Sequence, residues 1–167
     1  NAITIAEYVL MGMLTIAKGY RAVVRAQGRH EWLTDAPGKV ELGKKLYFDP
    51  RLPSTGTVSC NTCHDVRKAG DDGLPVSVGV EGKKGTRSAP TVWNAAFLSV
   101  QFWDGRSPNL EDQAKGPIIN PVEMGMPDHA AMLRRVVEIP AYVEEFRQVF
   151  GGDDPGTVGN GVKAIAA

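Results

Sequence analysis

The sequence predicts a mainly α fold with long loops between modest helices. Apolar residues recur at helical spacing in several stretches, as Leu42 and Leu46 do four positions apart. Glycine (19) and proline (11) are frequent, which favours long connections. The length of 167 residues and the hydrophobic share of 43% are those of a globular chain with one main domain.

The first predicted element is a long helix over residues 3–24. Its apolar run YVLMGMLTIA is shorter than a membrane span, which needs about 20 residues. Because this helix is apolar all round, three interpretations stay open: a plain core helix, contact with a membrane surface, or contact with a second chain, which would be another protein or a further copy in a homo-oligomer. We expect residues 1–30 to form an apolar helical extension and residues 31–167 to form the main domain.

The next elements lead into a central, turn-rich part of the chain. After a loop over 26–37, a short helix is expected over 39–48, although Gly43 inside it is unfavourable. The stretch KAGDDGLPVSVGVEGKKGTRSAP, residues 68–90, is glycine-rich and predicted to be irregular. Residues 91–98 are predicted to be helical.

The best-marked helix is predicted over 107–118. Ser107 is expected to be its N-cap, Pro108 its first helical residue, and acidic side chains follow early. Three further short helices are expected toward the C-terminal end, over 128–136, 140–149 and 158–167.

The charge balance excludes some function classes. Lys and Arg (19) equal Asp and Glu (19), so no net positive field favours a nucleic acid or an anionic membrane as partner.

Both cysteines lie in one motif, CNTCH, in which His64 follows Cys60 and Cys63. A disulfide across two residues would close no useful loop, and a tetrahedral zinc site would need two more cysteines. A thioredoxin-like pair would need a βαβ setting, and no strand-rich pattern flanks the motif. The motif therefore predicts one covalent haem c, with two thioether links and His64 as the proximal ligand of the iron.

Haem attachment has two consequences for the expectations. The second ring nitrogen of His64 is expected to donate to a carbonyl, which fixes the tautomer. Because haem c is attached outside the bacterial cytoplasm, we expect a periplasmic or otherwise exported protein. No signal peptide is visible, so Asn1 is expected to be a mature or engineered N-terminus.

From about residue 39 onward, the chain resembles the N-terminal, peroxidatic haem domain of bacterial di-haem cytochrome c peroxidases. The matching stretches, in the family's order, are VELGKKLYFDPRL, GTVSCNTCH, GLPVSVGV, KKGTRSAPTVWNAAF, QFWDGR, EDQAKGPI and NPVEMG. The resemblance implies a cytochrome c-like haem domain that reduces hydrogen peroxide to water with electrons from a small cytochrome or copper protein. A related branch of the family oxidises a protein substrate instead, and nothing in these residues separates the two activities.

The resemblance also assigns roles to three residues. Glu123 and Gln113 would line the distal side of the haem, and Trp103 would lie on the electron route between two haems. A carboxylate in a dry pocket can move a proton between the peroxide oxygens, which is typically worth about 10²–10⁴ in rate. Without the resemblance, Glu123 would be interpreted as a solvated or salt-bridged carboxylate and Gln113 as an exposed helix residue. Trp103 would be interpreted as a packing aromatic.

Cationic loop residues have two interpretations each. Arg87 and Lys84 would either meet the haem propionates or form a solvated face. Arg106 is expected to pair with Asp104 rather than touch the haem.

The distal side departs from the family pattern. Many members carry a histidine ligand sixteen residues after the proximal one, and Val80 stands there in this chain. We therefore expect an open iron site that needs no reductive activation, with Met124, Met126 and His129 as the alternative ligands. Methionine ligation would favour a mono-haem electron-transfer cytochrome without peroxidase activity.

A second departure concerns the rest of the family's architecture. The family has another CxxCH domain after this one, so the chain is expected to be a fragment, to work with a second haem-bearing chain, or to be a single-haem protein. The family's calcium site uses an asparagine at the position of Ser88, which argues against calcium here.

Overall fold

The computed structural model describes residues 37–167, and the helix predicted over 3–24 lies outside them. This part of the chain is helical, and its only β pairing consists of two isolated bridges, Val78 with Lys84 and Gln101 with Ser107. The helices, in chain order, are α3 (Pro37–Phe48), α4 (Cys60–Cys63), the 3₁₀ helices η1 (Val80–Gly82) and η2 (Ala95–Phe97), α5 (Leu110–Ile119), α6 (His129–Val137), α7 (Pro140–Phe150) and α8 (Val158–Ile165). The mainly α prediction is confirmed.

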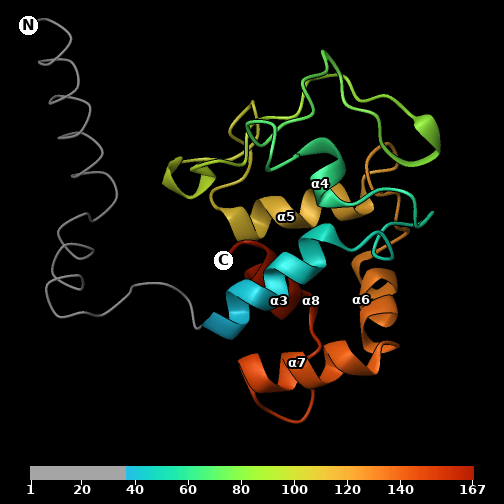
Figure 1. Cartoon of the computed structure of the whole chain (residues 1–167), viewed down its shortest axis with the longest axis vertical. Helices are drawn as coiled ribbons and strands as arrows, with labels where there is room; N and C mark the ends of the chain where they lie inside the picture. The colour runs from blue at the N-terminus through green and yellow to red at the C-terminus, as the bar shows by residue number, and fades with distance from the viewer. Residues whose placement is uncertain (1–36) are drawn as a thin grey trace, which may run out of the picture. The chain divides into compact units, whose positions relative to one another are not determined.

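The structure divides into a layer of packed helices and a layer of loops. Figure 1 shows α3 crossing α8, with α7 beneath them, while the chain between α3 and α5 loops over the opposite side. The core lies among the helices and in the two segments that follow α3 and α5. It consists of Leu42, Leu46, Leu52, Ile118, Met124, Met126, Ala131, Met132, Val136, Tyr142, Phe146, Val162 and Ala164.

Gly43 is explained by the crossing of α3 and α8. A Cβ atom at residue 43 would lie 1.8 Å from the carbonyl oxygen of Ala164, so only glycine lets the two helices approach this closely. The predicted shared face of Leu42 and Leu46 is confirmed, since both side chains are buried.

Two local predictions were wrong. Residues 91–98 do not form an α-helix: Asn94 adopts the left-handed region (φ 59°), and only the 3₁₀ turn η2 follows. The predicted start of the 107–118 helix, with Ser107 as N-cap and Pro108 as first helical residue, is wrong, because the Ser107 backbone pairs with Gln101 and α5 begins at Leu110. Asn109 caps α5 by accepting from the amide of Asp112.

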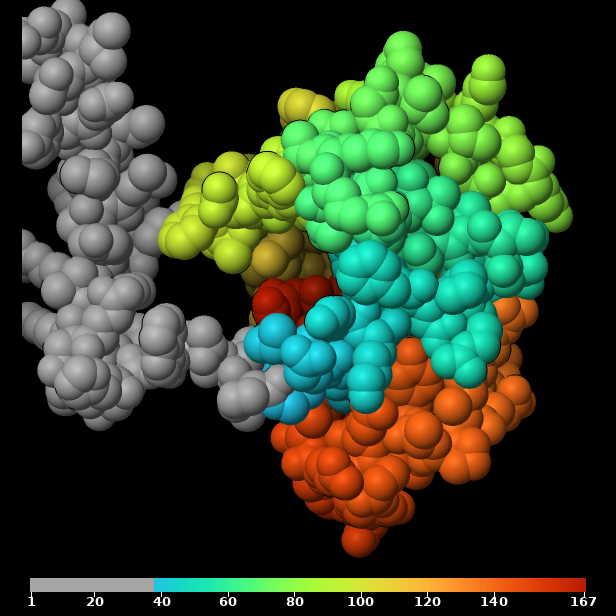
Figure 2. All heavy atoms as spheres, viewed as in Figure 1, coloured from blue at the N-terminus to red at the C-terminus, as the bar shows by residue number. Residues whose placement is uncertain are grey.

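Within residues 37–167, no helix is both long and apolar enough to cross a membrane. In the space-filling view, the red C-terminal residues form the floor of a recess between α3 and the yellow-green loop (Figure 2). Ile165, Ala166 and Ala167 line the cavity described next.

Candidate haem site

The CNTCH motif forms a single short helical turn, α4, that is fixed at both ends. At its start, the hydroxyl of Thr62 accepts from the amide of Ser59 at 2.9 Å. At its end, the Tyr47 hydroxyl of α3 donates to the carbonyl of His64 at 2.6 Å. The motif is therefore anchored to the helical layer.

His64 has the tautomer that an iron ligand requires. Its Nδ1 lies 2.9 Å from the carbonyl oxygen of Pro90, and since a carbonyl only accepts, Nδ1 carries the hydrogen. This confirms the predicted hydrogen bond and leaves the lone pair on Nε2. Burial lowers the pKa of His64, which favours the neutral imidazole that binds metals.

The two cysteine thiols are not those of a reactive redox pair. Burial raises the pKa of Cys60 to about 11 and also raises the pKa of Cys63, whereas reactive cysteines have a lowered pKa. Both are free of disulfides and line one cavity together with His64.

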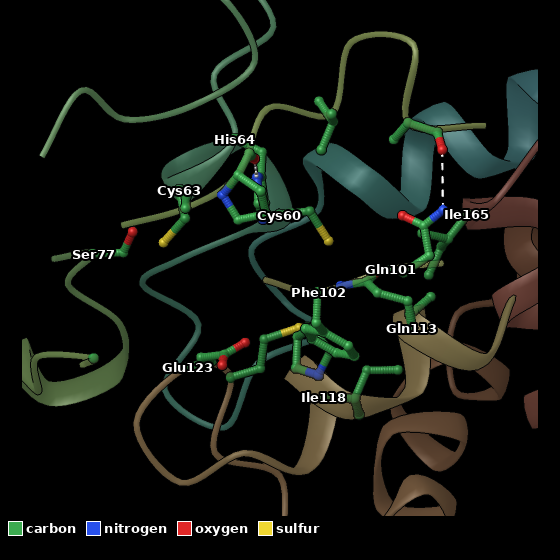
Figure 3. A pocket seen from close by; sticks show the side chains of 18 of the residues that line it. Cys60, Cys63, His64, Ser77, Gln101, Phe102, Gln113, Ile118, Glu123 and Ile165 are labelled. Carbon is green, nitrogen blue, oxygen red and sulfur yellow. Dashed lines mark hydrogen bonds between the residues drawn. The ribbon is translucent and has the colours of Figure 1, made fainter. Parts of the chain in front are cut away.

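That cavity has a volume of about 690 Å³, within the usual range of about 300–1,000 Å³ for ligand pockets. Figure 3 shows Cys60, Cys63 and His64 together on one side of it. Two thiols and a neutral imidazole on one wall are the donor set for covalent attachment and axial ligation of haem c, so the residues fit this cofactor.

Glu123 faces these residues from the other side of the cavity (Figure 3). Asn120 donates to its Oε1 at 2.6 Å. Burial raises the pKa of Glu123, while Arg106 and the Asn120 hydrogen bond oppose this shift. The side chain is therefore a half-buried carboxyl with increased proton affinity.

Backbone hydrogen bonds hold the segment that carries Glu123. The backbone carbonyl of Glu123 accepts from the amide of Val80 at 3.0 Å, and that of Met124 accepts from the amide of Ser54 at 2.9 Å. A Cβ at Gly79 would lie 2.0 Å from the Val122 carbonyl oxygen, which shows how closely the two segments approach. The position of Glu123 is thus set by contacts distant in the sequence.

The other residues named by the family resemblance lie around the same cavity. Gln113 reaches it from α5, and Trp103 lines it while remaining 61% exposed. The indole Nε1 of Trp103 donates to the carbonyl of Ser88 at 2.9 Å. The structure therefore brings Glu123, Gln113 and Trp103 together with the CNTCH motif.

The alternative iron ligands differ in their access to the cavity. Met124 lines it, whereas Met126 is buried in the core and His129 lines a neighbouring pocket. The Nε2 of His129 lies 2.9 Å from the Lys115 carbonyl, to which it donates. Val80 is buried away from the cavity lining.

The loop cations also lie at the cavity. Lys84, Arg87 and Arg106 are among its lining residues. The expected pairing of Arg106 is confirmed, with 2.7 Å between its Nη1 and Oδ1 of Asp104, and Arg87 reaches the same carboxylate at 3.3 Å. Among the residues described, no group of three or more His, Cys, Asp or Glu side chains could hold a metal ion.

Sequence reasoning missed two residues of the site. Asn120 precedes a proline, which marks a turn but not its hydrogen bond to Glu123. Phe102 carries no sequence signal, yet it lines the cavity with a left-handed backbone (φ 66°).

Comparison with known proteins is consistent with this site. A family model described as di-haem cytochrome c peroxidase matches residues 37–167. The chain is 52% identical over 110 residues to cytochrome c551 peroxidase of Pseudomonas aeruginosa, covering 66% of this chain and 32% of that protein. It is 43% identical over 136 residues to methylamine utilization protein MauG of Paracoccus denitrificans, covering 68% and 35%.

A solved structure of a MauG-like protein associated with microbial copper homeostasis has a TM-score of 0.71 and 29% identity, covering 80% of this chain and 40% of that one. The chain thus spans about a third of the length of the curated relatives it matches.

Proposed function

Because the chain belongs to the di-haem cytochrome c peroxidase family, we propose that residues 37–167 form a haem c-dependent domain that reduces hydrogen peroxide to water. Cys60 and Cys63 would attach the haem, and His64 would bind its iron. The bound haem would supply a redox-active iron that binds peroxide and passes electrons to it.

The observation that carries this proposal is the position of Glu123. Its carboxyl faces the cavity from the side opposite His64, and its burial raises its pKa. Such a carboxyl can take a proton from one peroxide oxygen and deliver it to the other, which is general acid–base catalysis. Asn120 orients the carboxyl through Oε1, and Gln113 would orient the peroxide with its amide.

The electron source and the location follow from the family and the cofactor. We propose a small cytochrome or copper protein as the donor and the periplasm as the location, since haem c is attached outside the bacterial cytoplasm. The second haem would be carried by a further part of a longer chain or by a separate polypeptide. Trp103, at the cavity and largely exposed, would lie on the electron path.

The test is the variant Glu123→Gln, which keeps the shape of the side chain and removes its acid–base function. We expect peroxide turnover with a reduced donor to fall by about 10²–10⁴, while mass and ferric absorption spectrum still report attached haem. Glu111→Gln, on the exposed side of α5, is the matched control and should leave turnover unchanged. Equal turnover in both variants would contradict the role of Glu123.

One observation also keeps the electron-carrier alternative testable. Met124 is the candidate sulfur ligand that lines the cavity. With an open iron site, Met124→Leu leaves the ferric spectrum unchanged. Loss of a weak far-red absorption band in this variant would instead indicate methionine ligation and a mono-haem cytochrome without peroxidase activity.

A further inference from the structure

A second pocket lies against the haem cavity and shares part of its wall. It has a volume of about 350 Å³ and is the more open of the two. Phe102, Arg106 and Glu123 line both spaces. Glu123 therefore borders the haem cavity on one side and this outer pocket on the other.

Phe102 is held firmly in this shared wall. Its backbone is in the left-handed region (φ 66°), which an aromatic residue rarely adopts. The Arg106 guanidinium lies 3.4 Å from the ring centre, and the ring packs so closely on α5 that a Cβ at Gly116 would lie 3.0 Å from its Cζ. Figure 3 shows Phe102 on the same side of the cavity as Glu123, across from His64. A strained residue that is held at one ring face by Arg106 and at the ring tip by α5 points to a functional constraint.

The outer pocket is suited to small polar molecules. Its lining includes Asp112, Lys115 and His129, and the Lys115 ammonium lies 3.6 Å from the Asp112 carboxylate. These charged and hydrogen-bonding groups can bind hydrogen peroxide, which resembles water in its hydrogen bonding. To pass from this pocket through the shared wall into the haem cavity, a larger apolar peroxide would have to move past the Phe102 ring.

We propose that hydrogen peroxide reaches Glu123 through the outer pocket, and that the clamped Phe102 ring sets the size of the molecules that pass. This inference rests on the proposed function, because it supplies the substrate path to the same carboxyl. Phe102 is then the residue that selects hydrogen peroxide over bulkier hydroperoxides.

The test compares ligand entry in the haem-loaded full chain by stopped-flow absorption. Cyanide serves as a small probe of the ferric iron and imidazole as a larger one. Phe102→Gly removes the ring and suits the positive φ, while Ile119→Trp fills the outer pocket from a side chain that is 42% exposed. Phe97→Ala is the control, since Phe97 is 55% exposed and lines neither space.

We expect Phe102→Gly to raise the association rate constant of imidazole severalfold more than that of cyanide. Ile119→Trp should lower both rate constants severalfold, and Phe97→Ala should change neither. The same Phe102 variant should consume tert-butyl hydroperoxide faster relative to hydrogen peroxide.

Two results would overturn the proposed path. Unchanged rate constants in Ile119→Trp would mean that ligands enter through the mouth of the haem cavity. An equal effect of Phe102→Gly on cyanide and imidazole would show that the Phe102 ring does not select ligands by size. Normal peroxide turnover with either result would leave the proposed function intact. The expected ligand pattern without any peroxide turnover would instead overturn the proposed function and support the path.

Discussion

The helices and the loop region, residues 49–109, bury their apolar side chains to very different extents. The main core cluster lies almost wholly in α3, α5–α8 and the segment after α5, and the loop region contributes only Leu52 to it. Most of the large apolar side chains left exposed in residues 37–167 lie in the loop region instead: Val66, Leu74, Trp93, Phe97, Leu98, Val100 and Trp103.

This difference indicates two sources of stability. The helices bury most of their apolar side chains against one another. The loop region surrounds a cavity that suits a haem, and a bound cofactor stabilises the folded state that holds it. The haem should therefore act as the core of the loop region.

The largest expected effect is the loss of the haem itself. The double variant Cys60→Ala, Cys63→Ala should carry no covalent haem by mass spectrometry, because both thioether links are gone. Backbone amides of residues 49–109 should then lose hydrogen-exchange protection, while those of α3, α7 and α8 should keep it. An equal loss of hydrogen-exchange protection in both regions, or no loss in either, would contradict the idea that the haem stabilises the loop region and not the helices.

Matched phenylalanine substitutions measure the contrast directly. Phe146 of α7 is 1% exposed, so Phe146→Ala should lower the free energy of unfolding by about 3–5 kcal/mol. Phe97 in the loop region is 55% exposed, so Phe97→Ala should change the free energy of unfolding by no more than about 0.5 kcal/mol. Denaturant unfolding of the haem-loaded protein followed by far-UV circular dichroism gives both values. Similar losses would show that Phe97 is buried by contacts absent from residues 37–167.

The same division separates what the sequence could predict from what it could not. The helices expected over 39–48, 128–136, 140–149 and 158–167 lie close to the observed bounds of α3, α6, α7 and α8, because each helix needs only one apolar face against its neighbours. In the loop region, the helix expected over 91–98 fails at Asn94, where a left-handed residue that no periodicity reveals interrupts it.

The candidate site shows a similar limit. The CNTCH motif predicted Cys60, Cys63 and His64, and the family resemblance predicted that Glu123 and Gln113 lie near them; all line one cavity. Asn120 and Phe102 were missed because their roles depend on backbone angles and on segments brought together only by folding.

Glycine substitutions sharpen the comparison within the helical layer. Gly43→Ala places a methyl group against the Ala164 carbonyl, and this overpacking should cost stability at the upper end of about 1–3 kcal/mol. Gly159→Ala in α8 is the control, since its Cβ would lie 3.8 Å from the nearest atom, Oγ1 of Thr157. That variant should gain about 0.5–1 kcal/mol from helix propensity. Thermal unfolding of both variants checks that their stability changes have opposite signs. Unchanged stability in Gly43→Ala would show that α3 and α8 can move apart without cost.

The smallest expected effect lies where the two regions join. Asp49, directly after α3, accepts from the amide and Nε of Arg51 at 2.8 Å and from the Tyr142 hydroxyl of α7 at 2.8 Å. The Arg51 hydrogen bond is the main cause that holds the pKa of Asp49 below its usual value. This stabilisation is complete above the unfolded-state pKa of about 3.9 and is lost as the pH falls through the lower folded-state pKa.

Asp49→Asn should therefore lose about 1.5 kcal/mol at neutral pH, since hydrogen bonds to charged groups are worth about 1.5–3 kcal/mol. Urea unfolding at a series of pH values should show that the gap in the free energy of unfolding between this variant and the parent protein narrows below about pH 4. Asp153→Asn, at an exposed position between α7 and α8, serves as the control with no gap. A gap that stays constant as the pH falls would mean that the contribution of Asp49 does not depend on the charge of its carboxylate, because a contribution from that charge disappears when the carboxylate is protonated.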